Sequence, residues 1–130
     1  MNDFPAPART SLSEPYWQGL EEGRLRFQRC ARCAHAWLPP RAECPECLQA
    51  DWRWETASGR GRLISWVVYH IAYHAYFKDK LPYNVALVEL EEGPRLISNV
   101  AGTNALRIDQ PLELSIEREA NTALARFRCR

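Results

Sequence analysis

The sequence lacks an excess of either charge, and it lacks any long apolar run. Seventeen lysines and arginines stand against sixteen aspartates and glutamates, which gives a net charge of +1. A basic excess is the usual footprint of a nucleic-acid-binding protein, so nucleic acid is not an expected partner. No segment approaches the roughly 18 apolar residues needed to span a bilayer. The N-terminus has neither the basic start nor the apolar core of a signal peptide. We therefore expect a cytoplasmic protein that makes no membrane contact.

The sequence also lacks the motifs that mark the common catalytic centres. It has no Gly-x-Ser-x-Gly elbow and no glycine-rich phosphate loop. Its acidic residues fall mostly at positions typical of a surface, such as Glu21 and Glu22 at the end of a predicted helix. Catalytic groups need not be adjacent in sequence, so a free-standing enzyme stays open as an alternative. We assign no catalytic residue and expect no activity of the chain on its own.

What the sequence does have is a dense group of cysteines. Four of the five lie in CARCAHAWLPPRAECPEC, as two Cys-x-x-Cys pairs separated by ten residues. Two such turns brought together by a hairpin supply four thiolates at the corners of a tetrahedron, which is the coordination that Zn²⁺ prefers. Cytoplasmic thiols stay reduced, which favours a metal over a disulfide. We predict a structural metal site, with zinc as the ion and iron as the alternative, held by Cys30, Cys33, Cys44 and Cys47.

Four protein ligands close the coordination shell, so this metal is expected to hold the fold rather than to catalyse. A pair of redox dithiols is the competing interpretation, but the thioredoxin-type motif accompanies a βαβ unit that this sequence does not show. His35 is a further candidate ligand, two residues after Cys33. Cys129 is too far along the chain to join either pair, and we expect it to be a free thiol. The flanking segments cannot bury much of a core, so the metal is expected to supply most of the folding energy there.

The first of three segments, residues 1–24, combines a proline-containing arm with a short helix that Ser13 can cap. Tyr16, Trp17 and Leu20 fall on one face of this helix at helical spacing. So short a helix is marginal alone, and its aromatic face is expected to dock on something. Docking on the chain's own body and docking on a partner or ligand both remain open.

The other two segments are rich in β structure. Residues 25–57 place a short strand on each side of the cysteine pairs, which predicts a zinc ribbon. Residues 58–130 contain five apolar, β-branched runs, with hairpins at YNVALVELEEGPRLISNV and LELSIEREANTALARFRCR. Five short strands suit an oligonucleotide/oligosaccharide-binding (OB) barrel, with an SH3-like barrel as the competitor. We therefore predict a mainly β fold with an N-terminal helical segment, a zinc ribbon and a C-terminal five-stranded OB-fold barrel.

The segment HIAYHAYFKDK concentrates aromatic rings beside lysines. On an extended strand, the i, i+4 spacing of its two histidines puts them about 13 Å apart, which is too far to share one ion. Aromatic rings next to positive charge suit a nucleotide-like ligand, whose base stacks and whose phosphates pair. Rings that merely close the end of the barrel are the alternative. The candidate contact residues for such a ligand or for a partner are Tyr16, Trp17, His70, Tyr73, His74, Tyr76, Phe77, Lys78 and Lys80.

The order of parts resembles one family from about Pro15 to the C-terminus. The parts are PYWQGLEEGRL, the paired cysteine knuckles, SGRGRLISWVV, LPYNVALVELEEGPRLISNV and a hairpin ending near RFR. The family is the zinc-ribbon/OB-fold family first catalogued as domain of unknown function thirty-five and associated with acyl-CoA. The resemblance implies a rubredoxin-like zinc ribbon, a C-terminal OB barrel, and the four clustered cysteines as metal ligands. The sequence departs from the family where Ala34 and Leu48 replace the glycine that often follows each cysteine pair.

The resemblance further implies work beside thiolase-like enzymes, aldolases or acyl-CoA hydratases that act on CoA thioesters. We therefore expect an accessory or scaffold subunit of lipid metabolism that binds acyl-CoA, such a partner enzyme, or both. The chemistry would then belong to the partner. A nucleic-acid-binding zinc-ribbon/OB module, in which barrel-face aromatics stack on bases, is the alternative. The near-neutral charge argues against it.

Overall fold

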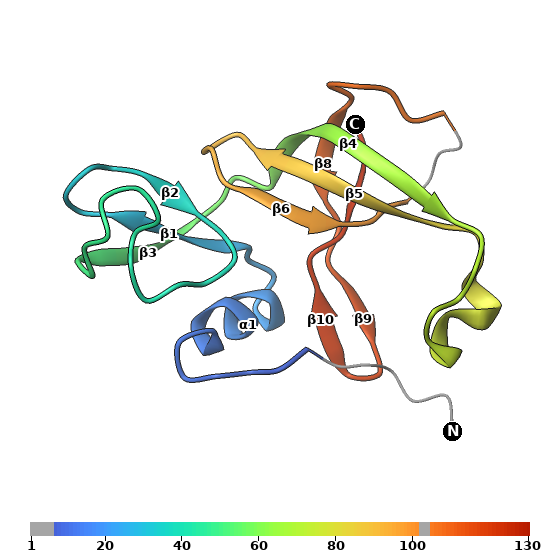
Figure 1. Ribbon diagram of the computed structural model, residues 1–130, viewed down its shortest axis with the longest axis horizontal. Coiled ribbons are helices and arrows are strands. Elements are labelled where there is room, and N and C mark those ends of the chain that lie inside the picture. Colours follow the sequence, from blue (N-terminus) through green and yellow to red (C-terminus); the bar gives the residue numbers. More distant parts are fainter. Residues whose placement is uncertain (1–6, 102–104) are drawn as a thin grey trace.

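A three-stranded sheet, a six-stranded sheet, a two-stranded hairpin and one α-helix form the framework of the fold (Figure 1), for which a computed structural model describes residues 7–101 and 105–130. The small sheet belongs to the cysteine-containing segment and the larger one to the C-terminal half. Part of the predicted N-terminal arm therefore lies outside the described residues. Within the described ranges, no helix is both long enough and apolar enough to cross a bilayer.

Helix α1 spans Glu14–Glu21, as the sequence predicts, and Gly23 ends it with a φ of 82°. Ser13 occupies the N-cap position, but its side chain makes no cap hydrogen bond. The backbone N–H of Thr10 donates to Ser13 Oγ instead, at 2.9 Å. Leu20 is buried, and Tyr16 and Trp17 pack against the same core. The aromatic face of the helix therefore docks on the chain's own body.

The small sheet carries the cysteine pairs and consists of three antiparallel strands in the order β2-β1-β3. The strands are β1 (Arg26–Cys30), β2 (Ala36–Trp37) and β3 (Trp52–Thr56). The buried cluster around its cysteines comprises Cys30, Trp37 and Cys44, with Cys47 and Trp52 partly buried against them. Phe27 on β1 and Ala36 on β2 are also buried. So small an apolar cluster contributes little burial energy, which leaves room for a metal to stabilise it.

The larger sheet has the order β6-β5-β4-β8-β11-β7. Its strands are β4 (Arg60–Tyr69), β5 (Tyr83–Leu90), β6 (Arg95–Ser98), β7 (Val100–Ala101), β8 (Pro111–Leu114) and β11 (Phe127–Cys129). The sheet thus has six strands where five were predicted, because Asn99 separates β6 from β7. Strand β6 pairs with β5, and β7 pairs in parallel with β11.

The second predicted hairpin is interrupted but keeps one register. Strands β8 and β11 pair Leu114 with Phe127, and β9 (Glu117–Glu119) and β10 (Thr122–Leu124) pair Glu117 with Leu124. Ala120 and Asn121 turn the chain with φ values of 48° and 69°. Two consecutive left-handed residues are the signature of a tight type I′ turn. The β9–β10 end projects from the sheet and reaches α1, where Arg118 pairs with Glu21 at 2.6 Å.

The main core lies inside the larger sheet and beneath α1. Buried positions alternate along β5 and β6, and the neighbouring strands add the fully buried Leu63, Leu112 and Phe127. Gly61 is needed where β4 and β5 approach closely, because a Cβ there would lie 2.7 Å from the carbonyl oxygen of Glu89. The segment between β4 and β5 contains a 3₁₀ helix, η1 (Ala75–Lys80).

Candidate metal centre and adjoining cavity

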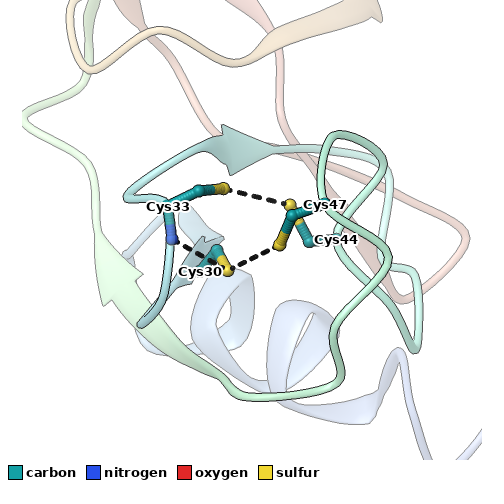
Figure 2. A group of neighbouring side chains, drawn as sticks. All are labelled: Cys30, Cys33, Cys44 and Cys47. Atoms are coloured by element: carbon teal, nitrogen blue, oxygen red, sulfur yellow. Dashed lines mark hydrogen bonds between the residues drawn. The ribbon is translucent and has the colours of Figure 1, made fainter.

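The four clustered cysteines converge on one point (Figure 2). The first pair begins at Cys30, the last residue of β1, and the second lies in the loop before β3, so the two pairs face each other. Sγ of Cys30 lies 3.5 Å from Sγ of Cys47, and Sγ of Cys33 lies 3.6 Å from Sγ of Cys44. All four sulfurs lie within 4.8 Å of one another. A tetrahedron with Zn–S bonds of about 2.3 Å separates its sulfurs by about 3.8 Å, so the sulfur spacing fits this ion.

The two cysteine turns repeat one local geometry. The backbone N–H of Ala34 donates to the carbonyl of Cys30 at 3.0 Å, and that of Leu48 donates to the carbonyl of Cys44 at 2.9 Å. Ala34 and Leu48 have φ values of 66° and 64°, which is the left-handed region. A side chain there costs roughly 1–2 kcal/mol that glycine would avoid. Both turns therefore keep a backbone conformation that Ala34 and Leu48 would not favour on their own.

The thiols cannot all ionise without a nearby cation. The backbone N–H of Cys33 donates to Sγ of Cys30 and lowers the pKa of the Cys30 thiol to about 7, with help from the N–H of Arg32. The backbone N–H of His35 lowers the pKa of Cys33, but desolvation and the three neighbouring thiol groups outweigh it and raise that pKa to about 12. A bound divalent cation offsets such repulsion, because a metal-ligating thiol is deprotonated.

The other metal-binding candidates lie apart from this group. His35 stacks on Trp37 with ring centroids 6.2 Å apart. Across the described ranges, the four cysteines are the one group of three or more Cys, His, Asp or Glu side chains placed to share an ion. Cys129 lies on β11, away from both pairs, and has no disulfide partner.

A cavity of about 660 Å³ opens beside the larger sheet, between η1, the start of β5 and the β9–β10 hairpin. Of the residues predicted as ligand or partner contacts, Phe77 and Lys80 line it. The other lining residues include an apolar group and a charged group, which sequence reasoning missed. They are Tyr83, Val85, Ile97 and Leu124, and Glu117, Glu119 and Arg126.

Glu119 is the centre of the charged wall. It accepts hydrogen bonds from the Tyr76 hydroxyl and from Arg126 Nη1, the latter at 3.1 Å, and Lys80 Nζ lies 3.9 Å away. Arg126 also pairs with Glu117 at 2.8 Å. The Tyr76 hydrogen bond is the main cause that lowers the pKa of Glu119, and the same bond raises the pKa of Tyr76. These contacts fasten η1 to the β9–β10 hairpin, and we call Glu119 and its partners the node of the cavity wall.

The remaining predicted contact residues divide into two places. Tyr73 is 80% exposed and touches Tyr69, with ring centroids 6.0 Å apart. His74 accepts a hydrogen bond from the backbone N–H of Tyr76 and so caps η1. His70 and Lys78 are exposed and do not line the cavity. The helix residues line a separate groove of about 440 Å³, which adjoins the cavity because Ile97 borders both. They are Tyr16 and Trp17, beside Leu38, Pro39 and Leu96.

Replacing Glu119 by glutamine is expected to destabilise the protein by about 1–2 kcal/mol at pH 7, because a charged acceptor of several hydrogen bonds is lost. The pKa of Glu119 is lower in the folded state than in the unfolded state. Its contribution to the free energy of unfolding is therefore fully present above the unfolded-state pKa of about 4.3. The contribution disappears as the pH falls through the folded pKa. The difference between wild type and Glu119→Gln should therefore shrink below about pH 4, which urea unfolding at several pH values measures.

Glu113→Gln is the matched control for this variant. Glu113 also pairs with an arginine, Arg128, at 2.7 Å, but both side chains are exposed. Exposed pairs contribute little, so this change is expected to stay within about 0.5 kcal/mol at every pH. Equal losses for Glu119→Gln and Glu113→Gln would contradict the assignment of Glu119 as the node of the cavity wall.

Comparison with known sequence families gives two adjacent matches. Residues 17–53 match the family described as "ChsH2, rubredoxin-like zinc ribbon domain". Residues 54–117 match the family described as "ChsH2, C-terminal OB-fold domain". The two matches follow the order of the small sheet and the larger sheet.

Individual relatives are of two kinds. The chain is 36% identical over 127 residues to a "Probable enoyl-CoA hydratase alpha subunit" of Thermomonospora curvata, covering 95% of this chain and 39% of that protein. It is 30% identical to a "DUF35 domain-containing scaffold protein" of Pyrococcus furiosus, covering 78% of this chain and 74% of that one. It also spans 57% and 60% of two other archaeal scaffold proteins, so several relatives are considerably longer than the match.

One solved structure matches along nearly the whole chain. It is a chain of "Ltp2-ChsH2(DUF35) aldolase", with a TM-score of 0.83 and 35% sequence identity. The match covers 95% of this chain and 98% of that one. The arrangement of helix, small sheet and larger sheet is therefore shared as a unit with that chain.

Proposed function

Because this chain belongs to the DUF35 family of zinc-ribbon and OB-fold proteins, we propose that it is an accessory subunit of an enzyme that acts on CoA thioesters. One observation carries the proposal: the chain matches one chain of an aldolase structure over 98% of that chain's length. The hydratase alpha subunit of Thermomonospora curvata contains a similar segment within a longer protein. The partner enzyme would be a thiolase-like protein, an aldolase or an acyl-CoA hydratase, and it would carry out the chemistry.

The four clustered cysteines are proposed to hold one zinc ion. A closed set of four thiolates supplies folding energy and leaves no coordination position for substrate. The ion would fix the small sheet beside α1 and the larger sheet, which we propose as the zinc-ribbon unit (25–57) and the OB unit (58–130). We further propose that β6 and β7 act as one strand, so that five strands close a barrel. Reduced thiols of this kind fit a cytoplasmic location.

The cavity beside η1 is the proposed site for the acyl-pantetheine part of an acyl-CoA. Its volume lies within the usual range for ligand pockets, and Phe77 and Tyr83 give it an apolar wall. The exposed lysines Lys78 and Lys80 stand at η1, where phosphates could pair with them. The other proposed contacts with acyl-CoA or the partner are His70, Tyr73, His74 and Tyr76, with Tyr16 and Trp17 in the adjoining groove.

Co-expression tests this proposal directly. The chain is produced together with the proteins encoded beside its gene, and a co-purifying thiolase-like, aldolase or hydratase protein is assayed with it for turnover of an acyl-CoA. Co-purification in a fixed ratio, with activity that neither protein shows alone, is the expected result. Absence of a complex, together with no heat of acyl-CoA binding to the isolated chain, would overturn the proposal.

A further inference from the structure

Strand β4 extends beyond its neighbour on one side. Strand β8 pairs with it only at Arg60–Arg62, whereas β5 pairs with it as far as Tyr69. In the described part of the chain, no backbone hydrogen bond joins Ser65–Tyr69 to any residue outside the β4–β5 ladder. Figure 1 shows β4 and β5 continuing together beyond β8 as a two-stranded arm that leads to η1. The β5 strand of this arm contacts β7, because Asn84 hydrogen-bonds to the backbone of Val100. Among the described residues, nothing pairs with one edge of Ser65–Tyr69, and we call it the open edge.

This open edge has almost none of the features that keep edge strands from pairing. Natural edges are blunted by charges, prolines or bulges. From Ile64 to Phe77 the sequence contains no lysine, arginine, aspartate, glutamate or proline. A shift of register between Leu63 and Ser65 is the one irregularity in the β4–β5 ladder, and it precedes the open stretch.

Trp66 of this stretch packs partly buried against the main core, but the two valines that follow it are exposed, one on each face. Val67 is 53% exposed and Val68 is 46% exposed, although successive side chains on a strand point to opposite faces. Tyr69, Ile71 and Tyr73 continue the exposed apolar surface. A contiguous apolar patch of this kind usually marks an interaction site.

We propose that the Ser65–Tyr69 edge of β4 accepts an extended segment of the partner enzyme, which adds a strand to the sheet. This inference rests on the proposed function. Main-chain hydrogen bonds to the open N–H and C=O groups would supply affinity, and the exposed valines and Tyr69 would select the segment's side chains. The segment should itself be uncharged, with β-branched or aromatic residues, because a charge opposite Val67 or Val68 would be buried without a partner.

A partner enzyme is the occupant that the comparisons favour over a second copy of this chain. The matching solved structure is described by two protein names, and one of its chains corresponds to this chain over 98% of its length. A chain with this fold thus occurs in a structure named for a second protein as well. The arm is also continuous with η1, whose Phe77 and Lys80 line the proposed acyl-CoA cavity. A strand added along β4 would bring the partner next to that ligand.

The test uses the complex obtained by co-expression and two readouts. Hydrogen exchange of the backbone amides in Ser65–Tyr69 should slow at least tenfold in the complex compared with the free chain. The double variant Val67→Lys/Val68→Lys should bind the partner more weakly, with a Kd at least tenfold higher than that of wild type. Ile108→Lys is the control, because Ile108 is an equally exposed apolar residue, at 59%, outside the arm. The control should bind as wild type does, and thermal unfolding should show that all variants are folded.

The outcomes separate this inference from the proposed function. If wild type forms no complex, the proposed function fails. If the complex forms but edge exchange and the affinity of the double variant are unchanged, the strand-addition proposal is wrong and the proposed function stands. If the free chain sediments as a dimer whose β4 edge is already protected, and the double variant is a monomer, the occupant is a second copy, which also overturns the proposal.

Discussion

Replacing Cys44 by alanine is expected to unfold the cysteine-containing sheet and to abolish binding of the partner enzyme. Cys44 is fully buried and is one of the three residues in the buried cluster around the cysteines of that sheet. Structural zinc contributes on the order of 10–16 kcal/mol of apparent binding free energy to small zinc domains. A site with three thiolates cannot retain most of this, and the remaining apolar cluster is too small to compensate.

Three measurements check this expectation. Freshly purified Cys44→Ala should contain less than half an equivalent of zinc plus iron, where wild type contains about one. Its tryptophan fluorescence should shift to the red, because Trp37 and Trp52 lose their packing. The variant should fail to bind the partner enzyme, so any loss of turnover should follow from the loss of the complex. Cys129→Ala is the matched control, since Cys129 lies outside the site, and it should retain zinc and stability.

A different pattern of results would show that the cysteines act in catalysis. If Cys44→Ala stayed folded, kept its metal and its partner, and lost only turnover, the group would be a chemical centre and not a structural one. The geometry argues for the structural role, because all four sulfurs already lie within 4.8 Å of one another. An ion at their centre would be enclosed by protein ligands on every side.

The features that the sequence predicts well are those encoded locally. Two Cys-x-x-Cys turns lie within 18 residues, so the convergence of Cys30, Cys33, Cys44 and Cys47 follows from short-range geometry and one hairpin. The β character of the larger sheet was likewise visible as apolar, β-branched runs, and residues 54–117 match an OB-fold family. Helix α1 was visible from Pro15 and the apolar face that it buries.

The features that the sequence hides are those that join distant residues. Tyr76 and Glu119 are separated by 43 positions and meet only because the β9–β10 hairpin reaches η1. No local pattern marks Glu119 or Arg126, since charged residues on a short hairpin usually face solvent. The open edge of β4 was equally invisible, because a strand's sequence does not state how far its neighbour extends. Even the strand count depended on Asn99, a single residue that interrupts one pairing and begins another.

Gln28 is a polar residue that the fold buries completely. Its replacement by leucine is expected to lower the free energy of unfolding by about 2–4 kcal/mol. Glutamine on a short strand usually faces solvent, yet Gln28 is fully buried on β1. Its Nε2 donates to the carbonyl of Arg41 at 2.8 Å, and its Oε1 accepts from the N–H of Arg41 at 2.8 Å. Leucine has nearly the same size but would leave both backbone groups of Arg41 without a partner, at about 1–3 kcal/mol each when buried.

This side chain matters because Arg41 precedes the second cysteine pair by only three residues. The amide of Gln28 does what a neighbouring strand would do, and it positions the loop that presents Cys44 to Cys33. Gln28→Leu should therefore weaken zinc retention against a chelator as well as lower stability to urea. Gln18→Leu is the matched control, because Gln18 is exposed on α1 and its side chain hydrogen-bonds to Glu22, and it should change stability by less than about 0.5 kcal/mol. If both glutamine variants behaved alike, the loop that carries Cys44 would be held by the metal alone, and zinc would order the segment instead of binding to a site that β1 has already arranged.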